Sequence, residues 1–218
     1  MDKRRLELFS DGVFVIVLTL LVLDLKPPLD DGLAGLREIA PGLAVHALTF
    51  FVIGTQWLIH HNMLAGVDEV RTRTLALNLL ALFFVTLIPF GARIAAEHPL
   101  GSLGIGLVIA CRAFYGLAIS AMAITARWSG FDDPEVRPTL IRVRWIGLVI
   151  TLVYLVAAGL CAVSPWFGYA VIPFALVWFL LPPVARMHSR ARTGGRTTDA
   201  KPSDIAADHL RPSRAQEQ

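Results

Sequence analysis

The chain has 218 residues, of which 55% are hydrophobic and 17% are charged, and its formal net charge is +3. Soluble globular domains contain about 45–50% apolar and about 25% charged residues, so this composition excludes an ordinary soluble fold. A membrane-spanning helix needs about 20 mostly apolar residues. The sequence predicts an all-α polytopic membrane bundle of six such helices, at residues 6–26, 42–62, 74–95, 101–127, 141–163 and 166–186.

The first window lies in the stretch RLELFSDGVFVIVLTLLVLDL, residues 5–25, which begins with a polar pair, Ser10 and Asp11. A carboxylate at the centre of a bilayer costs about 2.5–3.5 kcal/mol on insertion scales, and less toward the ends. Asp11 therefore needs a protein partner or water. Spacing alone leaves two interpretations open: the pair caps the start of the helix at the membrane interface, or it belongs to a packed polar cluster beside a water-filled path.

An apolar stripe follows in the same helix. Ile16, Leu20 and Leu23 stand at positions i, i+4 and i+7, which lie on one face of a helix, and Thr19 lies beside them. Most stripes of this kind only pack against other helices. Asp24 lies one turn beyond Leu20, so we expect its carboxylate at the far end of the helix.

Later segments carry fewer signals. Pro27 and Pro28 should end the first helix, and the loop after them is long enough for a short interfacial helix. His60 and His61 do not suit a metal site, because adjacent helical side chains point about 100° apart. Arg112 falls inside the fourth window and needs a partner or a route to the interface. We predict no metal or other cofactor.

Basic residues are distributed unevenly between the two sides of the predicted bundle. Lys and Arg favour cytoplasmic loops, so the richer side, which includes both terminal segments, predicts cytoplasmic termini. We expect a membrane domain at residues 1–187 and a disordered polar tail at 188–218. The bias accounts for the positive charge, so no nucleic-acid partner is predicted. The richer side carries Lys3, Arg4, Arg5, Arg71, Arg73, Arg127, Arg137, Arg142, Arg144, Arg186, Arg190, Arg192 and Arg196; the other carries Lys26, Arg37 and Arg93.

The stretch at residues 5–25 resembles the first-helix signature of the transmembrane protein 175 family of potassium channels. The family motif is Arg, three residues, then Phe-Ser-Asp, and it is matched by Arg5, Phe9, Ser10 and Asp11; the apolar continuation with Thr19 also matches. Elsewhere the resemblance is one of topology, with six spans, cytoplasmic termini and a QWLIHH sequence in the second helix. A single six-helix repeat resembles the prokaryotic members, which implies a homotetramer in a plasma membrane.

The resemblance also implies roles for individual residues. The first helix lines the pore in this family, and bulky apolar side chains form its narrowest part. Carried over by position, these are Ile16, Leu20 and Leu23, with Thr19 close by. The motif residues are implied to hold this helix in a polar network with the second and third helices. The polar candidates for that network are Trp57, His60, His61 and Asn78.

The predicted function is a potassium-permeable channel and not an enzyme, with potassium ions, membrane lipid and further copies of the chain as partners. The sequence has no Thr-Val-Gly-Tyr-Gly filter, so selectivity would arise at an apolar ring, where ion dehydration is costly. Asp24 at the pore mouth would raise the local cation concentration. One alternative is a secondary transporter or proton pathway that uses Asp11, Arg112 and the histidines. Another is a membrane enzyme with His60 or His61 as base.

Overall fold

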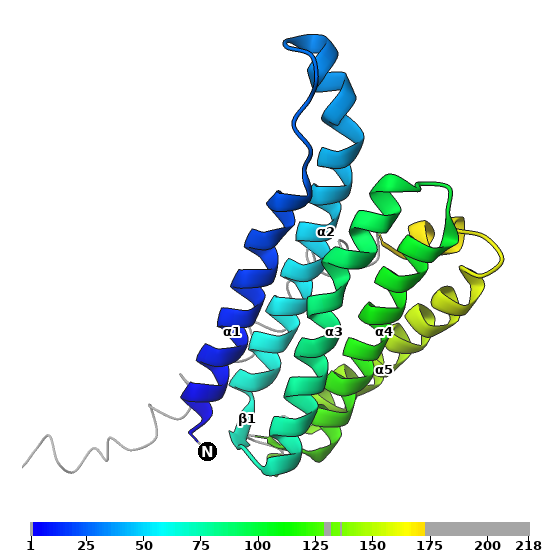
Figure 1. Cartoon of the computed structure of the whole chain (residues 1–218). Coiled ribbons are helices and arrows are strands. Elements are labelled where there is room, and N and C mark those ends of the chain that lie inside the picture. Colours follow the sequence, from blue (N-terminus) through cyan, green and yellow to red (C-terminus); the bar gives the residue numbers. More distant parts are fainter. Residues whose placement is uncertain (1, 129–131, 136, 173–218) are drawn as a thin grey trace, which may run out of the picture. The chain divides into compact units, whose positions relative to one another are not determined.

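The computed structural model describes residues 2–128, 132–135 and 137–172. Five long helices lie within these residues: α1 (Lys3–Leu20), α2 (Leu33–Ala65), α3 (Thr72–Glu97), α4 (Ser102–Thr125) and α5 (Arg137–Leu160) (Figure 1). Each is long and apolar enough to cross a membrane and coincides with one of the first five predicted windows. Residues 166–172 are also helical. The rest of the sixth window and the predicted tail at 188–218 lie outside the described residues.

The start of α1 excludes one interpretation of the Ser10–Asp11 pair. The helix begins at Lys3, and the side chain of Asp2 caps it by accepting a hydrogen bond from the backbone N of Arg4 at 3.1 Å. Asp is a favoured capping residue because its carboxylate satisfies a free N–H group of the first turn. Ser10 and Asp11 therefore lie about two turns inside the helix, and the interpretation that they cap its start is wrong.

The segment between α1 and α2 differs from the expected loop. α1 continues as the 3₁₀ helix η1 (Leu21–Asp24), and the chain then reaches Gly32, whose positive φ of 76° is easily adopted without a side chain. The expected separate interfacial helix is instead the first part of α2, which begins at Leu33 and runs through Pro41. With 33 residues, α2 is about 50 Å long and extends beyond the neighbouring helices (Figure 1).

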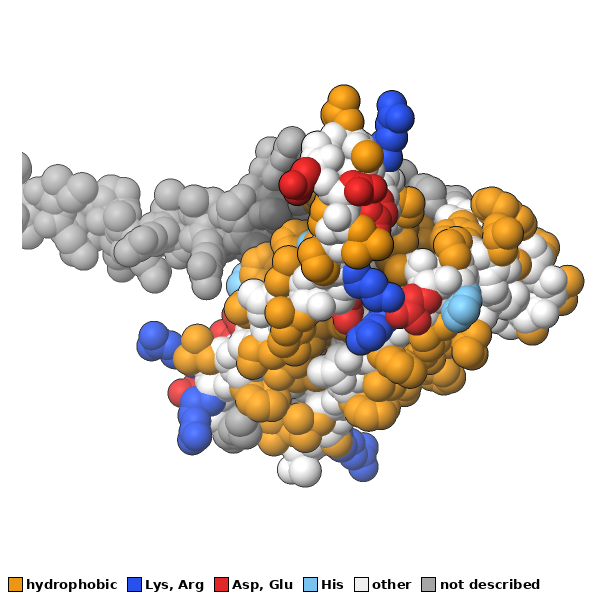
Figure 2. Space-filling model, turned by 45° about the horizontal axis from the view of Figure 1, so that its top comes forward, with side chains coloured by type: hydrophobic (Ala, Val, Ile, Leu, Met, Phe, Trp, Pro, Cys, Tyr) orange, Lys and Arg blue, Asp and Glu red, His pale blue; other side chains and the backbone are white. Residues whose placement is uncertain are grey.

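α4 lies at the centre of the helix packing. It packs between α3 and α5, and 67% of its apolar stretch is buried, against 28% for α1 and 17% for α5. One hydrophobic core joins α1, α2, α3 and α4, and a second joins α2, α4, α5 and the helical residues that follow α5. Figure 2 shows hydrophobic side chains over much of the visible surface, with charged side chains in a few separate groups. Such a surface is typical of a membrane or protein contact.

Small residues bring α3 and α4 close together. A Cβ atom added to Gly104 would collide with the backbone of Ala95, and one added to Gly91 would lie 3.0 Å from the side chain of Val108. Glycine at 104 therefore permits the close approach of two helix backbones.

The structure also contains a two-stranded antiparallel sheet that the sequence did not predict. β1 (Val67–Glu69) follows α2 and pairs with β2 (Arg127–Trp128), which follows α4, with Val67 opposite Trp128. The indole N of Trp128 donates to the backbone O of Ala123 at 2.7 Å. The sheet ties the ends of α2 and α4 together at the end of the bundle that carries the N-terminus (Figure 1).

Replacing Gly104 by Val should force α3 and α4 apart and destabilise the protein by about 1–3 kcal/mol, the usual cost of overpacking. Gly147→Val is the matched control, because a Cβ atom at Gly147 on α5 meets no atom within 4 Å. Thermal unfolding in detergent should show a lower midpoint for Gly104→Val than for the control. Equal midpoints for the two variants would contradict the close packing of α3 on α4.

Candidate functional site

Three side chains from three helices meet in a buried polar cluster. Asn78 of α3 is central: its Nδ2 donates to Ser10 Oγ of α1 at 3.1 Å, and its Oδ1 lies 2.7 Å from His60 Nε2 of α2. Because an amide oxygen only accepts, this arrangement places a proton of His60 on Nε2. All three residues are at most 1% exposed, so they depend on one another for their hydrogen bonds.

A second contact joins α1 to α2 beside this cluster. The indole N of Trp57 donates to Asp11 Oδ1 at 2.8 Å, and the ring of His61 stacks on Trp57 with the centroids 5.7 Å apart. Asp11 and Trp57 are both partly exposed. The carboxylate inside the membrane helix therefore has a protein partner, as its cost in lipid requires.

The other two motif residues lie outside these contacts. Arg5 and Phe9 are exposed, and the guanidinium group of Arg5 makes no hydrogen bond or ion pair with any residue that the structure describes. Arg5 precedes Ile16 by eleven residues, which leaves the two side chains about 20° apart around the helix at about 100° per residue. Arg5 therefore shares a face with Ile16. The residues that the structure brings together are Ser10, Asp11, Trp57, His60, His61 and Asn78.

The predicted apolar stripe faces outward. Ile16, Leu20 and Leu23 are 58%, 49% and 75% exposed, and the exposed Thr19 hydroxyl donates to the backbone O of Val15 and of Ile16 within its own helix. The opposite face of α1 packs on α2 and α3. Within the described part of the chain, α1 thus has one face that is packed and one that is uncovered.

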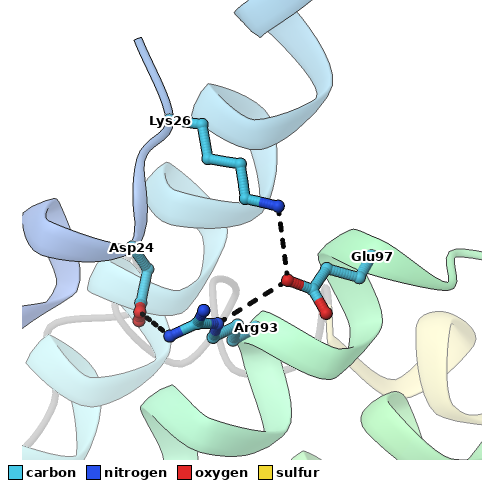
Figure 3. Close-up of polar contacts among 4 residues, drawn as sticks. All are labelled: Asp24, Lys26, Arg93 and Glu97. Atoms are coloured by element: carbon cyan, nitrogen blue, oxygen red, sulfur yellow. Dashed lines mark hydrogen bonds and ion pairs between the residues drawn. The ribbon is translucent and has the colours of Figure 1, made fainter.

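Asp24, the carboxylate expected at the far end of the first helix, forms an ion pair with α3. Its Oδ1 lies 3.5 Å from Arg93 Nη1 of α3, and Arg93 Nε lies 3.7 Å from Glu97 Oε1 (Figure 3). Lys26 Nζ lies 3.5 Å from the same Glu97 oxygen. The two carboxylates and two cations have a formal sum of zero, and the role of Asp24 at a pore mouth stays a prediction.

Arg112 lies apart from the motif residues. It is buried in α4, and its guanidinium carbon lies 4.8 Å from the ring centroid of Tyr154 and 5.7 Å from that of Tyr115. Its Nε has no hydrogen-bond partner among the described residues, and the rings supply cation–π contacts instead. These contacts do not connect Arg112 with Asp11 or His60. Among the same residues, no three His, Cys, Asp or Glu side chains are placed to hold a metal ion.

Two contacts of this region escaped the sequence analysis. Lys3 Nζ donates to the backbone O of Ala65 at 2.9 Å, which joins α1 to the end of α2. Tyr115 OH donates to the backbone O of Gln56 at 2.7 Å. The side-chain amide of Gln56 is itself fully buried, and neither its N nor its O has a partner in the described part of the chain. The sequence did contain a signal for this buried group, because Gln56 is a polar residue one turn before His60 within an apolar run.

Replacing Asn78 by Ala should leave Ser10 and His60 buried without partners, at a cost of about 1–3 kcal/mol for each unsatisfied group. Thr86→Ala is the control on the same helix, because the exposed Thr86 hydroxyl donates to the backbone O of Phe83 in its own helix. The unfolding midpoint in detergent should fall for Asn78→Ala and change little for Thr86→Ala. Similar midpoints would show that the cluster does not hold the three helices together.

Parts of the chain are similar to channels from bacteria and animals. The chain is 36% identical over 119 residues to a potassium channel of Chryseobacterium sp. (strain P1-3), which covers 52% of this chain and 62% of that protein. It is 35% identical over 176 residues to a potassium channel of Streptomyces collinus, which covers 75% of this chain and 84% of that protein. It is also 36% identical over 115 residues to the endosomal/lysosomal proton channel TMEM175 of Danio rerio, which covers 47% of this chain and 22% of that protein.

A solved structure and a family model agree with these similarities. The fold matches the crystal structure of a lysosomal potassium-selective channel TMEM175 homolog from Chamaesiphon minutus with a TM-score of 0.69, over 82% of this chain and 96% of that chain. At 24% identity, this match establishes the fold alone. The model of the family described as endosomal/lysosomal potassium channel TMEM175 matches residues 5–89, which contain the polar cluster and the stripe. The chain is an integral membrane protein and belongs to the TMEM175 family.

Proposed function

We propose that the protein is a potassium-permeable channel in which the α1 helices of four copies surround a central pore. One observation carries the proposal: polar contacts fix one face of α1, while the stripe of Ile16, Leu20 and Leu23 is uncovered on another. A helix held in this way is suited to present a defined face to neighbouring copies. The bacterial relatives named as potassium channels support potassium as the permeant ion.

The apolar stripe supports selection by dehydration. Four Ile16 side chains around an axis would form a narrow apolar ring, with Leu20 and Leu23 farther along the same path. An apolar constriction gates by dewetting, and an ion must give up part of its hydration shell to pass. Potassium holds its water less tightly than sodium, so such a ring favours potassium.

The motif divides into two parts in this proposal. Ser10 and Asp11 act within one copy, because their contacts with Asn78 and Trp57 set the rotation of α1 about its axis. Arg5 shares a face with Ile16, and its side chain has no partner among the described residues of its own chain. We therefore place Arg5 at the inner end of the pore-facing surface, in contact with the next copy.

The positions of basic residues support an orientation in the membrane. The N-terminus, the connection from α2 to α3 with Arg71, and the first turn of α3 with Arg73 lie at one end of the described bundle (Figure 1). Lys26 and Arg93 lie at the other end, beside Asp24 (Figure 3). By the positive-inside rule the first end faces the cytoplasm. We propose residues 1–187 as the channel domain in a prokaryotic plasma membrane and residues 188–218 as a cytoplasmic tail.

A proton pathway is the second candidate function. The Danio rerio relative is named a proton channel, and Asp11 and His60 belong to neighbouring contacts between α1 and α2. In a proton pathway these titratable groups would carry the transported ion. In a potassium channel they serve to hold α1 in place.

Ion flux into and out of liposomes tests the proposed function. Potassium should leave liposomes that contain the purified protein faster than it leaves protein-free liposomes, with valinomycin as the positive control. Sodium should leave the protein-containing liposomes more slowly than potassium does. An internal pH dye would report proton flux in the same vesicles. Proton flux without potassium flux would favour the second candidate, and no flux of either ion through an intact assembly would contradict both.

Replacing Ile16 by Asn should relax the constriction, because four amide side chains of similar length would hydrate the ring. Sodium permeability should rise more than potassium permeability, so the reversal potential under bi-ionic conditions should move toward zero. Val156→Asn is the control, since Val156 is similarly exposed, at 54%, but lies on α5. Unchanged selectivity in a well-assembled Ile16→Asn channel would falsify the assignment of Ile16 to the constriction.

A further inference from the structure

Ion pairs join the outer end of α1, opposite the N-terminus, to α3. Arg93 contacts Asp24 through Nη1 at 3.5 Å and Glu97 through Nε at 3.7 Å (Figure 3). We propose that Arg93 is a positioning residue for the outer part of the pore, because its pairing with Asp24 fixes the turn that carries Leu23. The inference rests on the proposed function, in which the stripe of α1 lines the pore.

The backbone of this turn is weakly fixed by its own hydrogen bonds. η1 ends at Asp24, the N–H of Leu25 donates to the O of Val22 at 3.2 Å, and the backbone is extended at Leu25. A 3₁₀ turn has poorer hydrogen-bond geometry than an α-helix. The orientation of the turn therefore depends on the side-chain contacts around it.

Those contacts lie on the side of the turn away from the stripe. Leu21 packs into the hydrophobic core, and Asp24 pairs with Arg93. Lys26 pairs with Glu97, so the chain meets α3 again two residues after Asp24. The turn is held before and after Asp24, and the direction of the neighbouring Leu23 follows from these attachments.

Leu23 is the stripe residue most sensitive to this arrangement. It is 75% exposed and belongs to η1, whereas Ile16 lies within the α-helix, near the Ser10 and Asp11 contacts. Loss of the Arg93 pair should therefore alter the outer ring and leave the inner ring in place. Lys26 and Glu97 alone cannot replace the direct pair, because neither of them contacts Asp24.

Arginine suits this bridging role for a chemical reason. Its planar group presents N–H donors in several directions, so it contacts two carboxylates at once, whereas a lysine ammonium is a compact point charge on a flexible stem. The paired side chains are partly exposed, and exposed ion pairs contribute little to folding free energy. The expected effect of breaking the pair is a change in local geometry and permeation, with folding preserved.

A charge-exchange experiment tests the inference in liposomes and planar bilayers. Arg93→Glu should change the potassium-to-sodium permeability ratio roughly two- to fivefold, the range that corresponds to exposed ion pairs. Combining Arg93→Glu with Asp24→Arg should restore the ratio, because the pair is rebuilt with reversed charges. Arg37→Glu is the matched control: it makes the same charge change on the same side, and Arg37 has no ion pair among the described residues.

The outcomes separate this inference from the proposed function. An original protein that conducts neither potassium nor sodium would overturn the proposed function itself. A conducting protein in which Arg93→Glu behaves like Arg37→Glu would contradict the positioning role, since only net charge would then matter. Failure of the double variant to restore the ratio would contradict it as well. Should Arg93→Glu fail to assemble, Arg93→Gln removes the pair without repulsion, and an unchanged ratio in that variant would overturn the inference.

Discussion

The hydrogen bonds of Asn78 set the geometry on which the rest of the arrangement depends. Apolar contacts hold helices together without fixing their rotation, whereas a buried amide requires partners in defined directions. One rotation of α1 presents Ser10 to Asn78 and Asp11 to Trp57. Ile16 follows Ser10 by six residues, so the same rotation turns Ile16 about 120° away from the cluster. The polar contacts thus determine which apolar residues face outward.

The burial of the described helices differs along one copy of the chain. α4 is the most enclosed of the described helices, while α1 and α5 leave most of their apolar stretches uncovered. Lipid can cover the exposed surface of α5. The exposed face of α1 differs because it carries Arg5 at its N-terminal end, in line with Ile16, and ends beside a cluster of ion pairs with a formal charge of zero. Those features suit a face that meets other copies and an aqueous path.

Much of this architecture could be predicted from the sequence, for physical reasons. Apolar runs of sufficient length marked the five described helices. The polar residues inside them were few, so Trp57, His60 and Asn78 were the available partners for Ser10 and Asp11. Helical periodicity alone places Arg5 on the same face as Ile16. The resemblance to the family motif instead assigned Arg5 to the polar network.

Other features depended on contacts between distant segments. The capping residue of α1 is Asp2, and it can be identified only once the helix is known to begin at Lys3. The unbroken passage of α2 through Pro41 has no local signal, since proline usually ends a helix. The ion pair of Asp24 with Arg93 joins residues far apart along the chain, and the pairing of β1 with β2 likewise joins segments that follow different helices.

The central claim is that Ile16 faces an aqueous pore. It is tested most directly by cysteine accessibility to Ag⁺, a cation similar in size to potassium. The background protein would carry alanine at the two native cysteines, Cys111 and Cys161, which are both buried. In that background, Ag⁺ should block potassium flux through Ile16→Cys rapidly and leave Val156→Cys unaffected. Equal sensitivity of the two variants, or no block of Ile16→Cys in a conducting assembly, would contradict the account.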